Sequence, residues 1–104
     1  GACGFSGIET AFSLCYTSLV LKKYFDLKRL SSLMSAEPAR RLRLNKGLIA
    51  TGMDADLVLI DLDASFEVNP ESFFSKGRYT PIAGKTLFGR IYKTFYKGQI
   101  VYEL

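Results

Sequence analysis

Hydrophobic positions in the first part of the chain recur at helical spacing. Between residues 8 and 19 the apolar side chains are separated by three, one, three and four positions, which places them on one face of a helix. They are Ile8, Ala11, Phe12, Cys15 and Leu19. Glu9 suits the positive end of this helix, and Lys22 and Lys23 suit its negative end. The pattern therefore predicts a first helix that is well buried.

Two shorter helices are predicted after it. Asp26 opens the first of them, over the segment DLKRLSSLM, whose leucines share one face. Ser35 is a candidate N-cap of the next, which has Pro38 in its first turn, where proline is tolerated. This helix is expected to stop near residues 45–47, where Asn and Gly can terminate it.

The pattern changes to that of strands after Gly47. Residues 55–61, ADLVLID, form a nearly continuous apolar run between turn-like segments, as in a strand that is buried on both faces. Residues 64–79 are predicted to be loop with at most one strand. Residues 87–102 are rich in aromatic and branched side chains and break at Lys97-Gly98, which predicts a hairpin. Helices followed by strands indicate an α+β chain whose two regions meet near Gly47.

The predicted strands lack neighbours. Three strands are near the minimum for independent stability, and the run LVLI needs cover on both faces, although the predicted helices are short. Two interpretations stay open at this point: the chain packs against further protein, or it closes on itself as a compact α+β domain.

The composition is that of a globular protein. With 104 residues the chain is one domain or a piece of one, and 48% of its residues are apolar and 23% charged. No run approaches the roughly 20 apolar residues that span a bilayer, so no membrane partner is expected. Two cysteines favour a reduced, intracellular protein, and the missing initiator Met favours a processed or excised chain.

The net charge of +4 is weak evidence for a nucleic-acid partner. The fourteen basic residues are scattered along the chain, with one local concentration at Arg40, Arg41, Arg43 and Lys46. The simpler interpretation is a solvated helix face or a domain contact. An autonomous module that binds nucleic acid or an acidic protein through this cluster stays open as an alternative.

The chain contains no histidine, which is the commonest general base near neutral pH and the commonest metal ligand. A Ser-His-Asp or Cys-His arrangement is therefore excluded within it. Cys3 and Cys15 stand twelve residues apart and do not form a structural zinc motif. No catalytic residue and no metal ligand is predicted in this chain.

A glycine-rich opening precedes the first helix. GACGFSGIET has three glycines in its first seven residues, and such a loop lets the backbone approach a ligand closely. Further short motifs follow along the chain. In order they are GxxGxET at 4–10, SAEPARRL at 35–42, KGLIATG at 46–52, ADLVLID at 55–61, YTPIAG at 79–84, LFG at 87–89 and KGQIVY at 97–102.

In this order the motifs resemble the C-terminal portion of bacterial dihydroorotases, in the cyclic amidohydrolase branch of the amidohydrolase superfamily. The resemblance covers essentially the whole chain. The ADLVL element is shared across the superfamily, whereas the Thr-Pro…Gly…Leu-x-Gly run and the opening motif point to dihydroorotase. A hydantoinase or allantoinase would share the fold and differ in substrate.

The resemblance implies a fold class and a function. The fold is an α+β fragment: residues 1–46 would be the final helices of a (β/α)₈ metal-dependent hydrolase barrel, and residues 47–104 strands of its small composite β domain. The family enzyme is cytoplasmic and interconverts N-carbamoyl-L-aspartate and dihydroorotate in pyrimidine biosynthesis. Its zinc, held by histidines and usually a carboxylated lysine, activates a water, and an aspartate shuttles protons. Those residues lie earlier in the family sequence, so the chain alone is expected to bind no zinc and to be inactive.

The resemblance also implies partners and one substrate contact. The partners are the remainder of the enzyme, the small-molecule substrate and, in a homodimer, a second copy; nucleic acid is not among them. The family loop before the first helix touches the substrate through its backbone, and the pattern maps this contact onto Cys3 and Gly4. Family members commonly have Ala-Pro-x-Gly where this chain has GACG, so Ala2 replaces a proline that would stiffen the loop. The alternative for Cys3 is a small buried or loop thiol.

Overall fold

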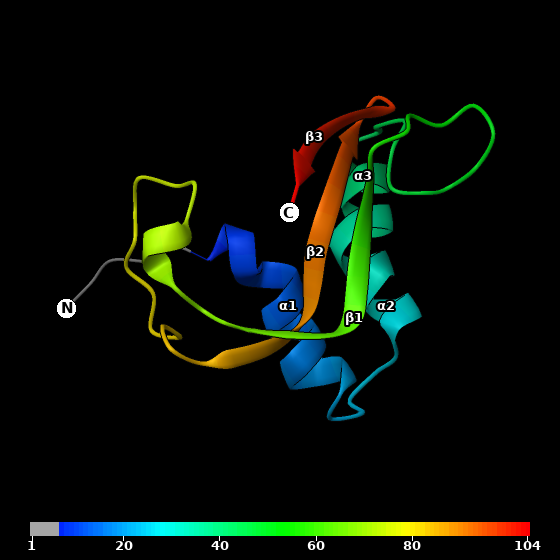
Figure 1. Ribbon diagram of the computed structural model, residues 1–104. Coiled ribbons are helices and arrows are strands. Elements are labelled where there is room, and N and C mark those ends of the chain that lie inside the picture. The colour runs from blue at the N-terminus through cyan, green and yellow to red at the C-terminus, as the bar shows by residue number, and fades with distance from the viewer. Residues whose placement is uncertain (1–6) are drawn as a thin grey trace.

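The computed structural model describes residues 7–104. Helices come first and a three-stranded sheet follows (Figure 1). Residues 8–20 are helical throughout, as η1 (Ile8–Thr10), α1 (Ala11–Cys15) and η2 (Tyr16–Val20). Residues 27–41 comprise α2 (Leu27–Ser31), η3 (Ser32–Ala36) and α3 (Glu37–Arg41). The strands are β1 (Leu57–Glu67), β2 (Thr86–Tyr96) and β3 (Gln99–Glu103), with the short turn η4 (Pro70–Ser72) between the first two.

Residues 27–41 form one continuous helical segment, so the two separate helices predicted there were wrong. Asp26 caps it as predicted, because its Oδ1 accepts the amide of Arg29 at 2.8 Å. Ser35 is no N-cap and lies inside η3. Pro38 has no amide hydrogen and crowds the carbonyl of the preceding turn. The helix widens to π geometry immediately before this proline and continues through it.

The second helical segment also ends earlier than predicted. Its last residue is Arg41, and Arg43 then takes a left-handed conformation with φ of 56°. The amide of Leu44 bonds back to the carbonyl of Ala39 at 2.9 Å, which closes the last turn.

The strands form one antiparallel sheet in the order β1-β2-β3. The hairpin predicted at Lys97-Gly98 is confirmed. Both residues have positive φ, 50° and 78°, as the tight turn that matches the twist of a hairpin requires. The predicted strand at residues 55–61 is also present, and it continues to Glu67.

A bulge interrupts the pairing of β1 with β2. Asp61 pairs with Arg90 and Ser65 with Phe88, so three residues of β1 stand opposite Gly89 alone. The Oδ1 atom of Asp61 accepts the amides of Asp63 and Ala64, at 3.0 and 3.2 Å, and holds the extra residues in a turn. The bulge frees backbone groups of β2 to bond outside the sheet.

The first helical segment uses these freed groups. The hydroxyl of Ser13 donates to the carbonyl of Gly89 at 2.6 Å, and the amide of Phe88 donates to Thr17 Oγ1 at 2.8 Å. The rings of Phe12 and Tyr16 stack with centroids 5.9 Å apart beside Gly89. A Cβ on Gly89 would lie 3.2 and 3.1 Å from these two rings. The helix can therefore approach β2 this closely only at a glycine.

The buried face of the first helical segment is not the apolar stripe that the sequence predicts. Thr10, Ser13 and Tyr16 are buried, whereas Ile8 is 87% exposed. The other members of the stripe are only partly covered. Small hydroxyl side chains face the sheet because they allow a close approach and satisfy the backbone groups of the bulge. Of the apolar stripe, Phe12 packs beside Gly89, whereas Ile8 is left exposed.

The hydrophobic core is small. Buried apolar side chains in the described range are Tyr16, Leu30, Ala39, Val68 and Leu87. The surface area is 7659 Å², whereas a compact protein of this length exposes about 5,800 Å². Val58 and Leu59, in the run predicted to be buried on both faces, are 47% and 40% exposed. That run is therefore uncovered within residues 7–104.

A projecting loop adds to the uncovered surface. It lies between α3 and β1 and extends away from the sheet as an arm (Figure 1), and residues 47–53 in it carry no charged side chain. In this arm Leu48 and Ile49 are 59% and 89% exposed. No helix in the described range is long and apolar enough to cross a bilayer.

Gly89→Ala is expected to lower the free energy of unfolding by about 3 kcal/mol. Alanine must adopt a left-handed backbone at about 1 kcal/mol, and its methyl group overpacks the two rings at about 2 kcal/mol. Gly98→Ala is the matched control, because Gly98 has φ of 78° but nothing within 4 Å of an added Cβ. It should cost only about 1 kcal/mol. Urea denaturation of both variants measures the difference, and equal losses would contradict the packing argument.

Candidate functional site

The predicted substrate contact at Cys3 and Gly4 lies outside residues 7–104 and stays a prediction. The structure does describe the helical turn into which this loop leads. The carbonyl oxygen of Gly7 accepts two hydrogen bonds from Thr10, one from its amide and one from its hydroxyl, each at 3.3 Å. Thr10 is buried, so this turn has a fixed position against the rest of the protein.

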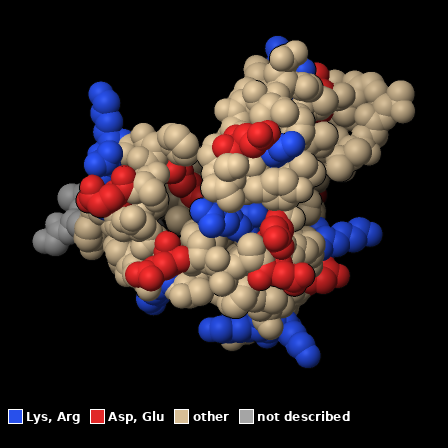
Figure 2. Space-filling model, viewed as in Figure 1, with Lys and Arg blue, Asp and Glu red and all other residues tan. Residues whose placement is uncertain are grey.

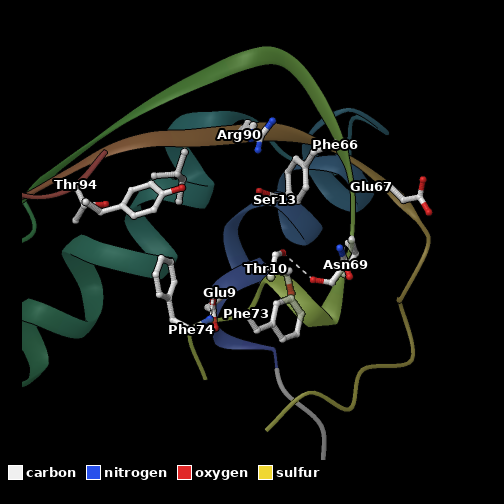
Figure 3. A pocket seen from close by; sticks show the side chains of 14 residues that line it. Glu9, Thr10, Ser13, Phe66, Glu67, Asn69, Phe73, Phe74, Arg90 and Thr94 are labelled. Carbon is white, nitrogen blue, oxygen red and sulfur yellow. Dashed lines mark hydrogen bonds between the residues drawn. The ribbon is translucent and has the colours of Figure 1, made fainter. Parts of the chain in front are cut away.

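A pocket of about 330 Å³ opens beside this turn (Figure 3). The helix contributes Glu9, Thr10 and Ser13, and β2 contributes Arg90 and Thr94. Aromatic side chains make up much of the remaining wall. They are Phe66, Phe73, Phe74 and Tyr102. The rings of Tyr102 and Phe74 form a T-shaped pair, with centroids 5.9 Å apart and an interplanar angle of 89°.

Most polar groups of the pocket already have partners. Ser13 bonds to Gly89, and Asn69 Oδ1 accepts the amide of Glu71 at 3.1 Å. Of the two carboxylates on the wall, Glu9 accepts two backbone amides, and Glu67 points away from the other labelled side chains (Figure 3). The pocket therefore offers no carboxylate that is free to act as a base.

Arg90 gives the pocket its positive charge. Its guanidinium lies over the ring of Phe66, 5.9 Å from the centroid, and within the described residues no carboxylate comes within 4 Å of it. Aromatic walls with one cation can hold a flat, anionic group. Within the described residues, no nucleophile of this pocket is paired with a base.

The described residues do not fit a metal ion. Across residues 7–104, no three His, Cys, Asp or Glu side chains come together as a ligand set would. Cys15 is a single, partly buried free thiol. No step of a metal-assisted reaction can be placed on these residues.

An ion pair holds the loop before β1 against the hairpin. Asp56 bonds to the ammonium of Lys46, and its Oδ1 accepts the amide of Lys97 at 2.8 Å. Both hydrogen bonds hold the pKa of Asp56 below its ordinary value, and the bond from Lys46 has the larger effect. The hydrogen bond to Asp56 in turn raises the pKa of Lys46. Lys46 also lies 4.9 Å from the ring centroid of Tyr96.

The basic cluster at residues 40–46 is partly neutralised, because two carboxylates face its four cations. Glu37 contacts Arg40 at 2.7 Å and Arg41 at 4.0 Å, and Lys46 pairs with Asp56. The hydrogen bond from Arg40 lowers the pKa of Glu37. Charges of both signs are interspersed over the face shown in Figure 2.

Comparison with known proteins places the chain in a family. A profile described as the amidohydrolase family matches residues 3–101. The chain belongs to the amidohydrolase family. Its antiparallel sheet and helices recur in solved structures of that family. The L-hydantoinase (dihydropyrimidinase) from Arthrobacter aurescens matches 96% of this chain with a TM-score of 0.88 and 33% identity. A D-hydantoinase (dihydropyrimidinase) from Thermus sp. matches 96% with a TM-score of 0.88 and 27% identity.

Curated relatives confirm the resemblance to dihydroorotases. The chain is 48% identical to the dihydroorotase of Clostridium botulinum over 103 residues, which is 99% of this chain and 26% of the relative. It is 41% identical to that of Listeria monocytogenes over 98% of this chain and 24% of the relative. The chain thus spans about a quarter of the length of these relatives, and 22–23% of the two hydantoinase structures.

Sequence reasoning missed the residues that fix the site in place. Ser13 and Thr17 bond to β2, and Glu9 reaches the segment after η4. One signal was present: Thr10, Ser13 and Thr17 recur at helical spacing and mark a hydroxyl face. The contact of Glu9 had no local signal, because its partners lie 65 and 66 residues away.

Asp56→Asn is expected to remove a pH-dependent part of the stability. Because its folded pKa is lowered, Asp56 stabilises the fold above its ordinary value of 3.8, and this contribution is lost as the pH falls through the folded pKa. The urea midpoints of the wild-type and D56N proteins should therefore differ most near neutral pH and converge in acid. Asp63→Asn, in the exposed bulge, controls for removal of one carboxylate. A constant difference across the acid range would contradict the assignment.

Proposed function

We propose that this chain is the C-terminal part of a cytoplasmic dihydroorotase, which interconverts N-carbamoyl-L-aspartate and dihydroorotate in pyrimidine biosynthesis. The likeness to dihydroorotases over nearly the whole chain carries this proposal, at up to 48% identity. The identity to the hydantoinases of similar fold is lower, 33% and 27%. The order of the short motifs supports the same choice.

In this proposal residues 1–46 are the final helices of a (β/α)₈ barrel and residues 47–104 belong to a small composite β domain. The uncovered apolar surface supports it. Exposed Ile8 on the first helical segment, the exposed part of β1 and the arm that carries Ile49 each need protein to cover them. The relatives are about four times as long and have ample chain for that purpose.

The zinc of such an enzyme supplies an activated water, and its ligands belong to the rest of the protein. This chain's own contribution is to hold substrate. The backbone at Cys3 and Gly4 would contact the substrate ring, on a loop that leads into the turn at Gly7. The bonds of Ser13 and Thr17 to β2 keep that turn in place.

Assay of the complete protein that carries this chain tests the proposal. We expect it to open dihydroorotate to carbamoyl aspartate, and to form dihydroorotate in the reverse direction, with hydantoin a much poorer substrate. The 104-residue chain assayed alone should show no turnover. Turnover of dihydroorotate by the isolated chain would contradict the fragment proposal. Preference for hydantoin over dihydroorotate would favour the alternative, a hydantoinase.

Val58→Glu tests whether β1 is covered in the complete protein. A buried, unpaired carboxylate should lower the free energy of unfolding by about 3 kcal/mol or more. Ser65→Glu, at an exposed site on the same strand, should change it by about 0.5 kcal/mol or less. Thermal or urea unfolding of the complete protein measures both. If Val58→Glu is tolerated as well as Ser65→Glu, this face of β1 is open to water and the assignment to a composite domain is wrong.

A further inference from the structure

Arg90 has no carboxylate partner within the described residues, and the six residues before them contain no Asp or Glu. On β2 it stands opposite Asp61, a position at which oppositely charged side chains are within reach of each other. The carboxylate of Asp61 is engaged elsewhere, because its Oδ1 accepts two amides of the bulge. The bulge therefore leaves the guanidinium of Arg90 without its cross-strand partner, beside the pocket that it helps to line.

The aromatic wall of this pocket suits a flat ligand. The guanidinium of Arg90 lies over the ring of Phe66, 5.9 Å from its centroid. Phe74 forms a T-shaped pair with Tyr102 and is nevertheless 81% exposed. An exposed ring that lines a pocket has a free face, against which a second ring can pack. The pocket thus offers a flat ligand a cation at one point and an aromatic surface at another.

The acidic acceptors of the pocket are not available to a ligand, whereas donors are. Glu9 accepts two consecutive backbone amides, at 3.1 and 3.0 Å, one through each carboxylate oxygen. Glu67 points away from the other labelled side chains (Figure 3). Among residues 7–104, the guanidinium of Arg90 and the hydroxyl of Tyr102 donate to no protein acceptor. The pocket therefore favours a ligand that brings acceptor oxygens.

We propose that this pocket binds a small planar carboxylate, an aromatic or heteroaromatic ring that carries one carboxyl group. Two N–H groups of the Arg90 guanidinium donate to the two carboxylate oxygens, because the planar guanidinium matches a carboxylate in geometry. The ring of the ligand packs against Phe74 and covers its exposed face. The volume of the pocket, about 330 Å³, is at the small end of the range for ligand sites and suits a single ring.

Benzoate is the probe, and its binding to the complete protein that carries this chain is measured by a saturation-transfer NMR titration. We expect saturable binding with a Kd of about 1 mM, as is usual for a ligand with so few atoms. Benzamide has the same ring but no charge, and should bind about tenfold more weakly because it loses the ion pair with Arg90. Cyclohexanecarboxylate keeps the charge but is not flat, and should bind about threefold more weakly.

Arg90→Met is the central variant, because methionine keeps much of the length of arginine and removes its charge. It should weaken benzoate binding about tenfold. Phe74→Ala should weaken it about threefold, and it is expected to leave the fold intact because the Phe74 ring is largely exposed. Arg78→Met is the matched control. Arg78 carries the same charge, pairs with Glu71 on the surface and is not among the residues that line the pocket, so its loss should change the Kd less than about twofold.

Three results would overturn the proposal. One is the absence of saturable benzoate binding up to about 20 mM, which would mean that the rest of the complete protein fills the pocket. Another is an equal Kd in the wild-type, R90M and R78M proteins, which would place the benzoate elsewhere. The third is tighter binding of benzylammonium than of benzoate, since a preference for the cation would mean that Glu9 and Glu67 determine the selectivity instead of Arg90. Because binding and not turnover is measured, none of these results depends on which cyclic amide the protein hydrolyses.

Discussion

The close approach of the first helical segment to β2 at Gly89 is the constraint on which the rest of the fold depends. Any side chain at this position would meet the rings of Phe12 and Tyr16, and the carbonyl of Gly89 needs the hydroxyl of Ser13 for a partner. The buried core is too small to orient the helix by itself, since in the described range no large side chain is less than 2% exposed. Hydrogen bonds to the bulge therefore fix the orientation of the first helical segment relative to the sheet, because hydrogen bonds are directional and apolar contacts are not.

The motifs that carry the family resemblance coincide with contacts of this kind. The aspartate that ends ADLVLID holds the bulge opposite Gly89, and the aspartate near its start binds Lys46 and the hairpin. Gly47 passes so close to the second helical segment that a Cβ would lie 2.8 Å from the carbonyl of Ser35. These motifs fix backbone positions, and a backbone position constrains sequence as strictly as chemistry does.

The sequence predicts well what neighbouring residues determine. The helical period of residues 8–20, the cap at Asp26 and the turn at Lys97-Gly98 depend on local geometry and are confirmed. Prediction failed where the local structure depends on a residue distant in the sequence or on an adjustment of the backbone. The hydroxyl face of the first helix is buried because a bulge more than seventy residues away offers it bonds. The predicted break at Ser35 is absent because π geometry accommodates Pro38. The contact at Cys3 and Gly4 lies outside the described residues, so its prediction stands as made.

The buried polar groups of this chain have their hydrogen-bond partners, whereas many of its apolar side chains are exposed. This difference indicates what kind of protein surface covers the chain. Within residues 7–104 every buried side-chain polar atom has a hydrogen-bond partner, yet large apolar side chains such as Ile8, Ile49 and Val58 are 87%, 89% and 47% exposed. The uncovered area is also spread over the first helix, β1 and the arm at Ile49 instead of forming one patch. A surface of that extent and distribution fits a chain embedded in a larger fold better than a module that meets a separate partner, because a docking partner covers one face, whereas a surrounding fold covers several.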